Sequence, residues 1–181
     1  MLDAAVLYGA LPARVDHVDD HIPASPDDQL PAWIDRYLTA AHGGPGIDPI
    51  TTGIRFGTEL NYSIPELDPD RPFSAEPDFL VQRLEDSRRN HIPGRATLIG
   101  PATFLTLALT TDGTDPLERI EELVEVQCRI LTHVAIAGSR WVQVDEPALS
   151  SPDSDQAAPS NNDEGLPERG RVSSTTPMRW D

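Results

Sequence analysis

The chain has 181 residues, enough for one ordinary domain and not comfortably enough for two. It carries 30 acidic against 14 basic residues, a formal net charge of −16, and every basic residue is an arginine. This charge repels nucleic acid and anionic membranes, and no apolar run approaches the roughly 18 residues that could cross a bilayer. We therefore expect no nucleic-acid or membrane partner. A single cysteine and the lack of a signal-peptide pattern make a cytoplasmic protein the expectation.

The first third of the chain shows two helical patterns separated by a loop pattern. Apolar residues in Leu2–Leu11 predict the end of a helix, and Pro31–His42 predicts a second helix with one apolar face. Residues 16–31 between them are rich in Asp, His and Pro and are predicted as a loop. Thr51–Thr58 has β-type residues and predicts a strand, which gives way to a loop at Tyr62–Glu66.

The middle of the chain predicts a helix and then a strand–helix–strand unit. Residues 75–90 are amphipathic and predict a helix, Ala96–Ile99 predicts a short strand, and Trp141–Asp145 predicts a second strand. A connection as long as the one between these strands requires a parallel pair with a crossover. The fold class predicted from these elements is α/β.

The long connection itself is predicted to be helical. Gly100-Pro101 turns the first strand into a helix near Ala102, and Asp115-Pro116 has the N-cap and first-turn proline of a second helix start. That helix is predicted to end at Gly138. Cys128 is assigned to its apolar face, as a buried and unreactive thiol.

The composition changes after Leu149. Residues 150–181 consist mainly of Ser, Pro, Asp, Asn and Gly, with few apolar side chains. Such a segment cannot bury enough apolar surface to offset its ordering entropy. We predict one folded domain over residues 1–149 and a disordered C-terminal tail over residues 150–181.

Candidate functional residues follow the ends of the two predicted parallel strands. Asp145-Glu146 ends the second strand and Gly100 ends the first, at the edge where α/β proteins build their sites. Successive strand residues point to opposite faces, so only one of the two carboxylates can face a ligand. The structural alternative is that Asp145 caps the next segment and Glu146 is solvated. Thr103 either caps the following helix or donates to a ligand.

No metal site is predicted. His17 and His21 are four residues apart beside several aspartates, but their segment is predicted as a loop and the spacing is interpreted as chance. Catalytic residues are likewise not predicted, since no nucleophile–base spacing or phosphate-binding glycine loop is present.

Four segments resemble the N-terminal domain of cobalamin-independent methionine synthase. They are LDAAVLYGALPAR at Leu2–Arg14, FGTELNYSIPE at Phe56–Glu66, LIGPATFLTLAL at Leu98–Leu109 and WVQVDEPAL at Trp141–Leu149. The last two are the most specific, and the order and separation of all four fit the family. The resemblance covers residues 1–149. It implies a TIM-type (β/α) barrel, which is partial here because a complete one needs roughly 250 residues.

The resemblance also implies an activity that the whole family enzyme performs. That enzyme moves a methyl group from 5-methyltetrahydropteroyltriglutamate to homocysteine in methionine biosynthesis, with zinc bound in a C-terminal barrel that this chain lacks. The N-terminal domain packs against that barrel and helps hold the anionic folate polyglutamate tail. No cofactor is therefore expected in this chain. Unpaired edges of a partial barrel predict a complementary barrel chain or self-association as partner.

The chain departs from the family at a basic residue that contacts the folate tail. A lysine of the family aligns with Ile54, and Arg55 is the candidate substitute, although a one-residue shift on a strand reverses its face. Weak candidates for substrate binding are thus Arg55, Thr103, Asp145 and Glu146. We expect the chain to be inactive alone, as a component of the synthase. The alternative is a non-catalytic remnant or interaction protein that keeps part of the barrel.

Overall fold

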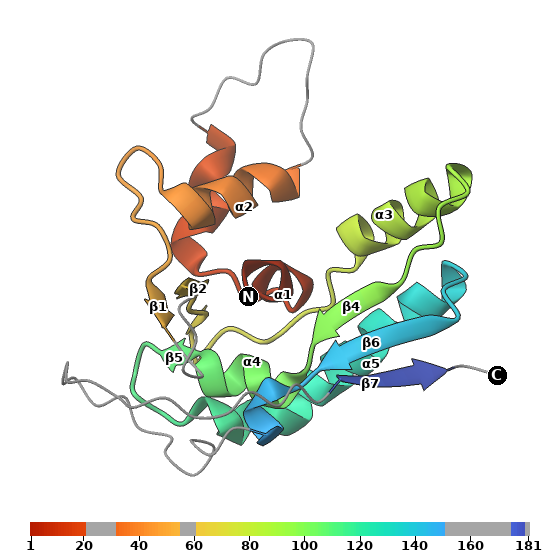
Figure 1. Cartoon of the computed structure of the whole chain (residues 1–181). Helices are drawn as coiled ribbons and strands as arrows, with labels where there is room; N and C mark the ends of the chain where they lie inside the picture. The colour runs from red at the N-terminus through yellow and green to blue at the C-terminus, as the bar shows by residue number, and fades with distance from the viewer. Residues whose placement is uncertain (21–31, 55–60, 151–174, 180–181) are drawn as a thin grey trace.

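The computed structural model describes residues 1–20, 32–54, 61–150 and 175–179, and the structural statements below concern these ranges. Figure 1 shows helices at the N-terminal end and a small sheet with its own helices toward the C-terminal end. The sheet and its connections hold Thr103, Asp145 and Glu146, three of the four candidate residues predicted from the sequence.

The N-terminal part consists of three short helical segments. They are α1 (Leu2–Leu7), the 3-10 helix η1 (Ala13–Asp20) and α2 (Ala32–His42). The two predicted helices are confirmed. The predicted loop at 16–31 is wrong for its first five residues, which belong to η1, and residues 21–31 lie outside the described part. Five of the six residues of α1 are buried, so tertiary packing stabilises a helix too short to form alone.

Two strand pairs follow in the next segment. β1 (Thr52–Ile54) and β2 (Asn61–Ser63) form an antiparallel pair, while β3 (Glu66–Leu67) pairs in parallel with β5 (Leu109–Thr110). The predicted strand at 51–58 is confirmed for β1, and residues 55–60 lie outside the described part. The predicted loop at Tyr62–Glu66 is wrong at both ends, since Tyr62 and Ser63 belong to β2 and Glu66 begins β3. Tyr62 and Ser63 pair with Gly53 and Thr52 of β1, a pairing that the residue pattern of the segment itself does not indicate.

The strand–helix–strand prediction is confirmed. α3 (Asp78–Arg89) precedes β4 (Ala96–Ile99), and β6 (Trp141–Asp145) pairs with β4 in parallel over four residue pairs, from Ala96–Val142 to Ile99–Asp145. The connection contains α4 (Pro101–Leu107), the 3-10 turn η2 (Pro116–Arg119) and α5 (Ile120–Ile136). The Asp115 side chain accepts a hydrogen bond from Leu117 N at 2.9 Å, which is the predicted cap.

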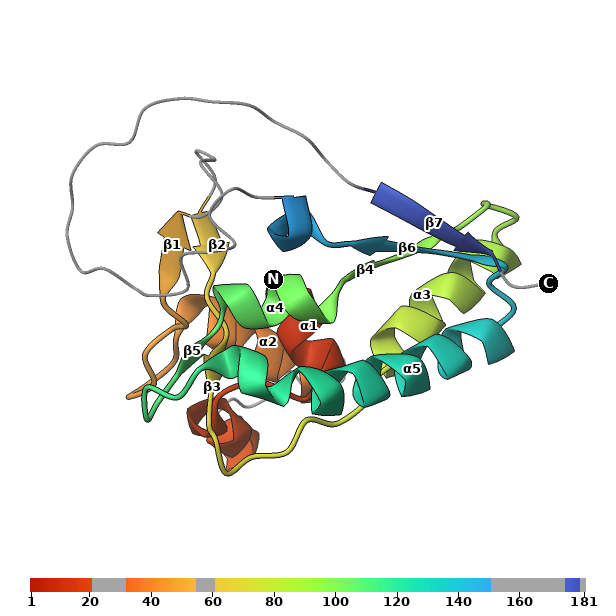
Figure 2. The ribbon, with the colours of Figure 1, turned by 90° about the horizontal axis from the view of Figure 1, so that it is seen from below.

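The β4–β6 sheet has one buried and one open face. Ala96, Leu98 and Val142 are buried in the main core, whereas Thr97 and Trp141 on the opposite face are exposed. Figure 2 shows α3 and α5 on the same side of β4 and β6. The alternation follows from the two-residue period of a strand, because only one face has helices to pack against. The candidate residues at the strand ends therefore border an open, polar sheet face.

Cys128 is a correction to the sequence prediction, because its thiol is exposed. The apolar face of α5 is narrower than the periodicity suggests. Its buried positions repeat at three- and four-residue steps and leave position 128 on the solvent side. They are Leu123, Val126, Gln127, Ile130 and Val134.

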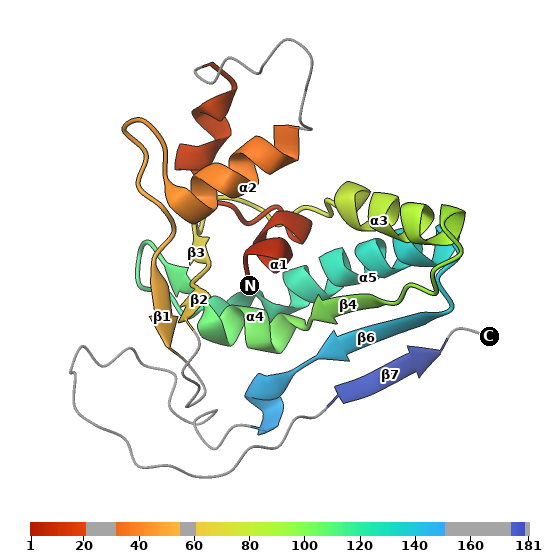
Figure 3. The same cartoon turned by 45° about the horizontal axis from the view of Figure 1, so that its top comes forward.

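The C-terminal tail is a second correction. Residues 175–179 form β7 (Thr175–Arg179), which pairs antiparallel with the whole of β6, and Pro147–Ser150 forms the 3-10 turn η3. Disorder is thus wrong for these residues, while residues 151–174 and 180–181 lie outside the described part. The free edge of β6 offers unpaired backbone groups, and β7 satisfies them even though its own sequence is poor in apolar residues. Figure 3 shows β4, β6 and β7 side by side in that order.

The fold class is α/β, as predicted, with a mixture of helices and small open sheets. No helix in the described residues is long and apolar enough to cross a membrane.

Candidate functional site and family membership

The strongest candidate site lies where β4 and β6 end. We call it the strand-end site and define it by Gly100, Thr103, Asp145 and Glu146. The two strands stop at the same sheet edge, since Ile99 is paired with Asp145 and the backbone N–H of Gly100 donates to the carbonyl of Asp145 at 2.9 Å. The parallel register therefore brings together residues that are more than forty positions apart in sequence.

The carboxylate of Glu146 caps helix α4 from the neighbouring strand. It accepts hydrogen bonds from the backbone N–H groups of Ala102 at 3.1 Å and Thr103 at 2.7 Å. Pro101 at the first helical position has no N–H, so the exposed donors of this helix end are accounted for. A negative charge is also favourable at a helix N-terminus. Glu146 is thus neither the solvated residue of the structural alternative nor a free catalytic carboxylate.

Gly100 makes room for this carboxylate. A Cβ atom built on Gly100 would lie 2.0 Å from Oε1 of Glu146, far inside van der Waals contact. The φ angle of Gly100 is −76°, an ordinary value, so glycine is required here by close approach and not by backbone conformation.

Thr103 is buried and its hydroxyl is fully engaged. Its Oγ1 donates to Glu146 at 2.6 Å and accepts from the backbone N–H of Ala148 at 3.2 Å. These contacts favour a structural role, and ligand binding by Thr103 stays a prediction. Together, Thr103 and Glu146 tie the start of α4 to the turn that follows β6.

Tyr8 is part of this arrangement, although sequence pattern did not indicate it. Its hydroxyl donates to the carbonyl of Ile99 at 2.6 Å, and its ring meets that of Phe104 edge to face at 5.0 Å. Burial, and secondarily the negative charge of Glu146, raises the pKa of Tyr8 far above its usual value. Tyr8 is consequently a neutral hydrogen-bond donor at any physiological pH.

Asp145 is the member of the strand-end site whose carboxylate is least engaged. It is half-buried, shares the open sheet face with Ile99, and accepts one hydrogen bond, from Nε2 of Gln143 at 2.9 Å. A carboxylate oxygen pair has about four acceptor positions, so Asp145 keeps capacity for a ligand that donates hydrogen bonds. Gln143 is a second residue that sequence pattern did not indicate. Arg55, the remaining candidate, lies outside the described residues.

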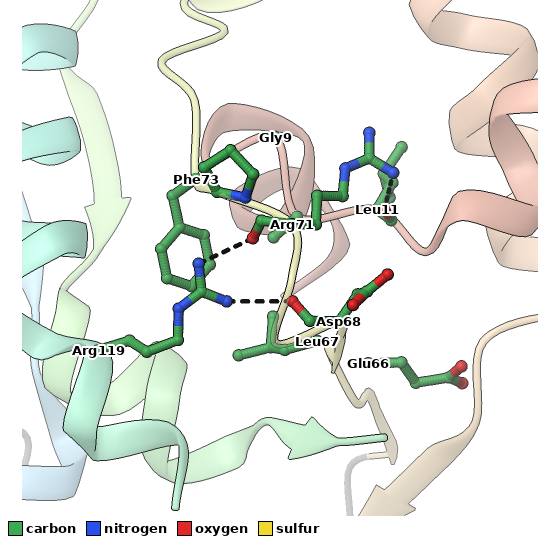
Figure 4. A pocket seen from close by; sticks show the side chains of 10 residues that line it. Gly9, Leu11, Glu66, Leu67, Asp68, Arg71, Phe73 and Arg119 are labelled. Carbon is green, nitrogen blue, oxygen red and sulfur yellow. Dashed lines mark hydrogen bonds between the residues drawn. The ribbon is translucent and has the colours of Figure 1, made fainter. Parts of the chain in front are cut away.

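A small hollow lies between the N-terminal segment and the turn η2 (Figure 4). Its cavity volume of about 10 Å³ holds at most one water molecule. Arg119 fills one side, with its guanidinium 4.0 Å from the ring centre of Phe73 and an Nη2 hydrogen bond to the carbonyl of Arg71 at 2.8 Å. Arg71 in turn donates to the carbonyl of Leu11 at 3.0 Å. These arginines hold loops together and leave no space for a substrate.

The described residues do not fit a zinc site. They contain no group of three or more His, Cys, Asp or Glu side chains placed to hold a metal ion. Cys128 lies alone on the solvent side of α5. None of the described residues is therefore assigned a role in zinc binding.

Comparison with known proteins identifies the family. The model of the cobalamin-independent synthase N-terminal domain matches residues 1–163. The chain belongs to this family. The match continues fourteen residues beyond the predicted domain boundary at residue 149, so the family pattern includes part of the segment that the sequence assigns to the tail.

Individual members of the synthase family show the same relationship. The 5-methyltetrahydropteroyltriglutamate–homocysteine methyltransferase of Mycobacterium tuberculosis is 41% identical over 150 residues, which are 82% of this chain and 18% of that protein. The enzymes of the same name from Mycobacterium leprae and Corynebacterium glutamicum are 39% and 40% identical over 150 and 149 residues. The chain thus spans about a fifth of the length of these curated relatives.

Proposed function

We propose that this chain supplies part of the N-terminal barrel of a methionine synthase and contributes to methyl transfer only together with the remaining parts of such an enzyme. The observation that carries the proposal is the 41% identity over 82% of the chain to a relative named as the methyltransferase. A cytoplasmic location belongs to the same proposal. The relatives' substrates, a methylated folate triglutamate and homocysteine, are the substrates we propose for the assembled enzyme.

The strand–helix–strand geometry supports a barrel segment. β4 and β6 are parallel, helices cover one face, and the other face presents Thr97, Gln143 and Asp145. In a closed (β/α) barrel the helix-free face points inward and the carboxyl ends of the strands form the mouth. Asp145 would then lie at the mouth, and Glu146 and Thr103 would fix the βα turn beside it.

The charge of Asp145 restricts its role. A polyglutamate tail is anionic, so a carboxylate repels it and cationic residues must hold it. Asp145 suits a ligand group that donates hydrogen bonds, and Arg55 is the residue we propose for the tail. Because the family's lysine position is Ile54 in this chain, we expect the tail to bind more weakly than in the relatives.

The open edge of β4 supports a complementary barrel partner. The backbone N–H of Gly100 donates a hydrogen bond to β6. In a parallel strand, the backbone groups of successive residues point to alternate sides, so those of Leu98 face β6 and those of Thr97 and Ile99 face the other edge. On that side, the described residues provide no second strand, and the Tyr8 hydroxyl takes the carbonyl of Ile99. A further parallel strand would complete the pairing. The alternative to a complementary barrel chain is self-association, in which a second copy of this chain pairs with the β4 edge.

A chimera tests the proposal. The aligned 150-residue segment of the Mycobacterium tuberculosis relative is replaced by the matching residues of this chain, and methionine formation is measured. A relative carrying the same deletion without replacement is the control. We expect the chimera to form methionine, with a raised KM for the triglutamate substrate, and the control to form none. A chimera that melts cooperatively yet forms no methionine would contradict the proposal and favour the non-catalytic alternative.

A further inference from the structure

A cleft lies at the opposite end of β4 and β6 from the strand-end site. It is bordered by the end of α3, the loop into β4 and the turn between α5 and β6, and its volume is about 380 Å³. Small-molecule sites commonly have volumes of roughly 300–1,000 Å³ and combine apolar walls with a few polar groups. Here Leu84, Ile92 and Ala137 are apolar, and Arg88, His91 and Ser139 are polar.

Two helix ends of the same type form the cleft. At the end of α5, Gly138 N donates to the carbonyl of Ala135 at 2.9 Å and Ser139 N to that of Val134 at 3.2 Å. This is a Schellman motif, and Gly138 has the left-handed φ of +89° that the motif requires.

The end of α3 repeats the motif with a histidine in the glycine position. His91 N donates to the carbonyl of Arg88 at 3.1 Å, Ile92 N to that of Ser87 at 2.9 Å, and the φ angle of His91 is +55°. His91 is the one non-glycine residue with positive φ among the described residues. A side chain in this conformation is strained, and such strain concentrates at functional sites. A glycine at position 91 would adopt this φ angle without strain, as Gly138 does at the end of α5.

The two loops that border the cleft lack acidic residues. Among the 30 acidic residues of the chain, none falls within residues 87–111 or 126–144. These two stretches include both loops of the cleft, and they contain Arg88, Arg95 and Arg140. In a protein with a net charge of −16, these two stretches are therefore basic, and the nearest carboxylates on α3, Glu85 and Asp86, are paired with Arg89.

Arg88 has no carboxylate partner in the described part of the chain. Its Nη1 reaches from α3 across to the α5–β6 turn, where it lies 3.4 Å from the position of a Cβ built on Gly138. The neighbouring Arg89, in contrast, pairs with Glu85 at 3.1 Å and Asp86 at 2.9 Å. An exposed, unpaired guanidinium thus stands beside Ile92, whose side chain is 60% exposed.

We propose that this cleft binds a small organic oxyanion, with Arg88 and His91 on a carboxylate or phosphate group and Leu84, Ile92 and Ala137 around its apolar body. The guanidinium presents several N–H donors to an oxyanion, and the imidazole of His91 adds a further donor. The site is independent of the proposed methyl transfer, because it lies at the other end of the strands.

Calorimetric titration of the full chain at low ionic strength tests the proposal. Phenyl phosphate and phenylacetate represent the two oxyanion types, inorganic phosphate lacks the apolar body, and benzyl alcohol lacks the charge. We expect one or both aromatic anions to bind, and the stronger of the two identifies the preferred group. Inorganic phosphate and benzyl alcohol should bind at least tenfold more weakly. Equal binding of benzyl alcohol, or no binding of either aromatic anion, would overturn the proposal.

Two variants separate binding from folding. Arg88→Gln should weaken the preferred anion by about tenfold, the loss of one charged hydrogen bond, while Arg89→Gln leaves its affinity unchanged. His91→Gly should raise the melting temperature by about 2 °C because it relieves the left-handed strain, and should still weaken binding. Unchanged anion affinity in both Arg88→Gln and His91→Gly would show that the helix end is merely structural.

Discussion

The carboxylate of Glu146 lies across the end of the sheet from its own strand and holds Thr103 by two hydrogen bonds, 2.7 Å from its backbone nitrogen and 2.6 Å from its hydroxyl. The contact joins the end of β6 to the start of α4, the helix that follows β4. The two adjacent carboxylates at this strand end therefore differ in role. Glu146 stabilises the turn, and Asp145 remains on the open face of the sheet.

The close approach of Gly100 and Glu146 predicts strong coupling between the two positions. Gly100→Ala should lower the free energy of unfolding by about 2–3 kcal/mol, because the new methyl group displaces the carboxylate. Glu146→Ala alone should cost about 2 kcal/mol through loss of the cap. Urea denaturation of the single and double variants forms a double-mutant cycle.

In that cycle, Gly100→Ala should cost much less when residue 146 is alanine. Gly44→Ala is the control, since its Cβ would meet only Thr39 Cγ2 at an ordinary 3.5 Å, and it should change stability by less than about 0.5 kcal/mol. Simple additivity of the Gly100 and Glu146 substitutions would show that the two residues do not share this space.

We expect the protein to lose stability at alkaline pH, where the buried hydroxyl of Tyr8 ionises on unfolding. Burial first, and the charge of Glu146 second, raises its pKa in the folded state, whereas an unfolded tyrosine ionises near pH 10. The stability from neutral Tyr8 is therefore complete below about pH 10 and declines above it, by about 1.4 kcal/mol per pH unit.

Tyr8→Phe should cost about 1 kcal/mol at pH 7 through the lost hydrogen bond to Ile99. The difference between wild type and Tyr8→Phe should shrink as the pH rises above about 10, as measured by urea denaturation between pH 7 and 11. Burial also raises the pKa of Tyr37. Both proteins should therefore retain a smaller decrease of stability with rising pH that comes from Tyr37. A constant difference across this range would contradict the buried, neutral hydroxyl.

We expect the protein to lose stability at acid pH as Glu66 becomes protonated. Burial alone would raise its pKa, but hydrogen bonds from Arg14 and the backbone of Thr51, with the charge of Arg14, outweigh burial and lower it. The stability from this carboxylate is present above the unfolded value of about 4.3 and is lost as the pH falls through the folded pKa.

Arg14→Gln should consequently cost about 1 kcal/mol or less at pH 7, because both side chains are partly solvated. The cost should be smaller once Glu66 is protonated, when only the hydrogen bonds from Arg14 to the carbonyls of Asp48 and Pro49 remain. Thermal unfolding between pH 3 and 7 measures this. Arg129→Gln, which removes an exposed pair with Glu125, should change stability at neither pH. An equal cost for Arg14→Gln at pH 3 and pH 7 would rule out the ion pair as its cause.

Pairing of β7 with β6 predicts that the tail protects a sheet edge. A chain ending at Ser150 exposes that edge, and unpaired strand edges associate. Light scattering at increasing protein concentration should show more self-association for this truncation than for the full chain. A chain ending at Arg179, which keeps β7, is the matched control. Equal association of both truncations would mean that β7 does not cover the edge.

The sequence predicts the elements whose signals are local. Apolar periodicity and the Asp115 cap are contained in one helix, and both are confirmed, as is the parallel pairing that the length of the connection requires. The same reasoning explains the errors. β2 and β7 are strands because β1 and β6 offer them hydrogen bonds, and neither segment shows a strong strand pattern of its own.

The candidate site was predictable as a place but not as a set of roles. Strand ends locate Thr103 and Glu146 at one edge, yet their hydrogen bonds span 43 residues of sequence and depend on the register of β4 and β6. Tyr8 reaches the site from another helix, so no spacing could indicate it. His91 in a glycine position is likewise visible only through its φ angle.

Methionine formation by the purified chain is the most direct test of the claim that it is one part of a methyltransferase. The chain is assayed alone with zinc, homocysteine and 5-methyltetrahydropteroyltriglutamate, and the Mycobacterium tuberculosis relative serves as positive control. We predict no methionine above the uncatalysed background from the chain. Turnover by the chain alone would contradict the account, because it would place a complete methyl-transfer site within these 181 residues.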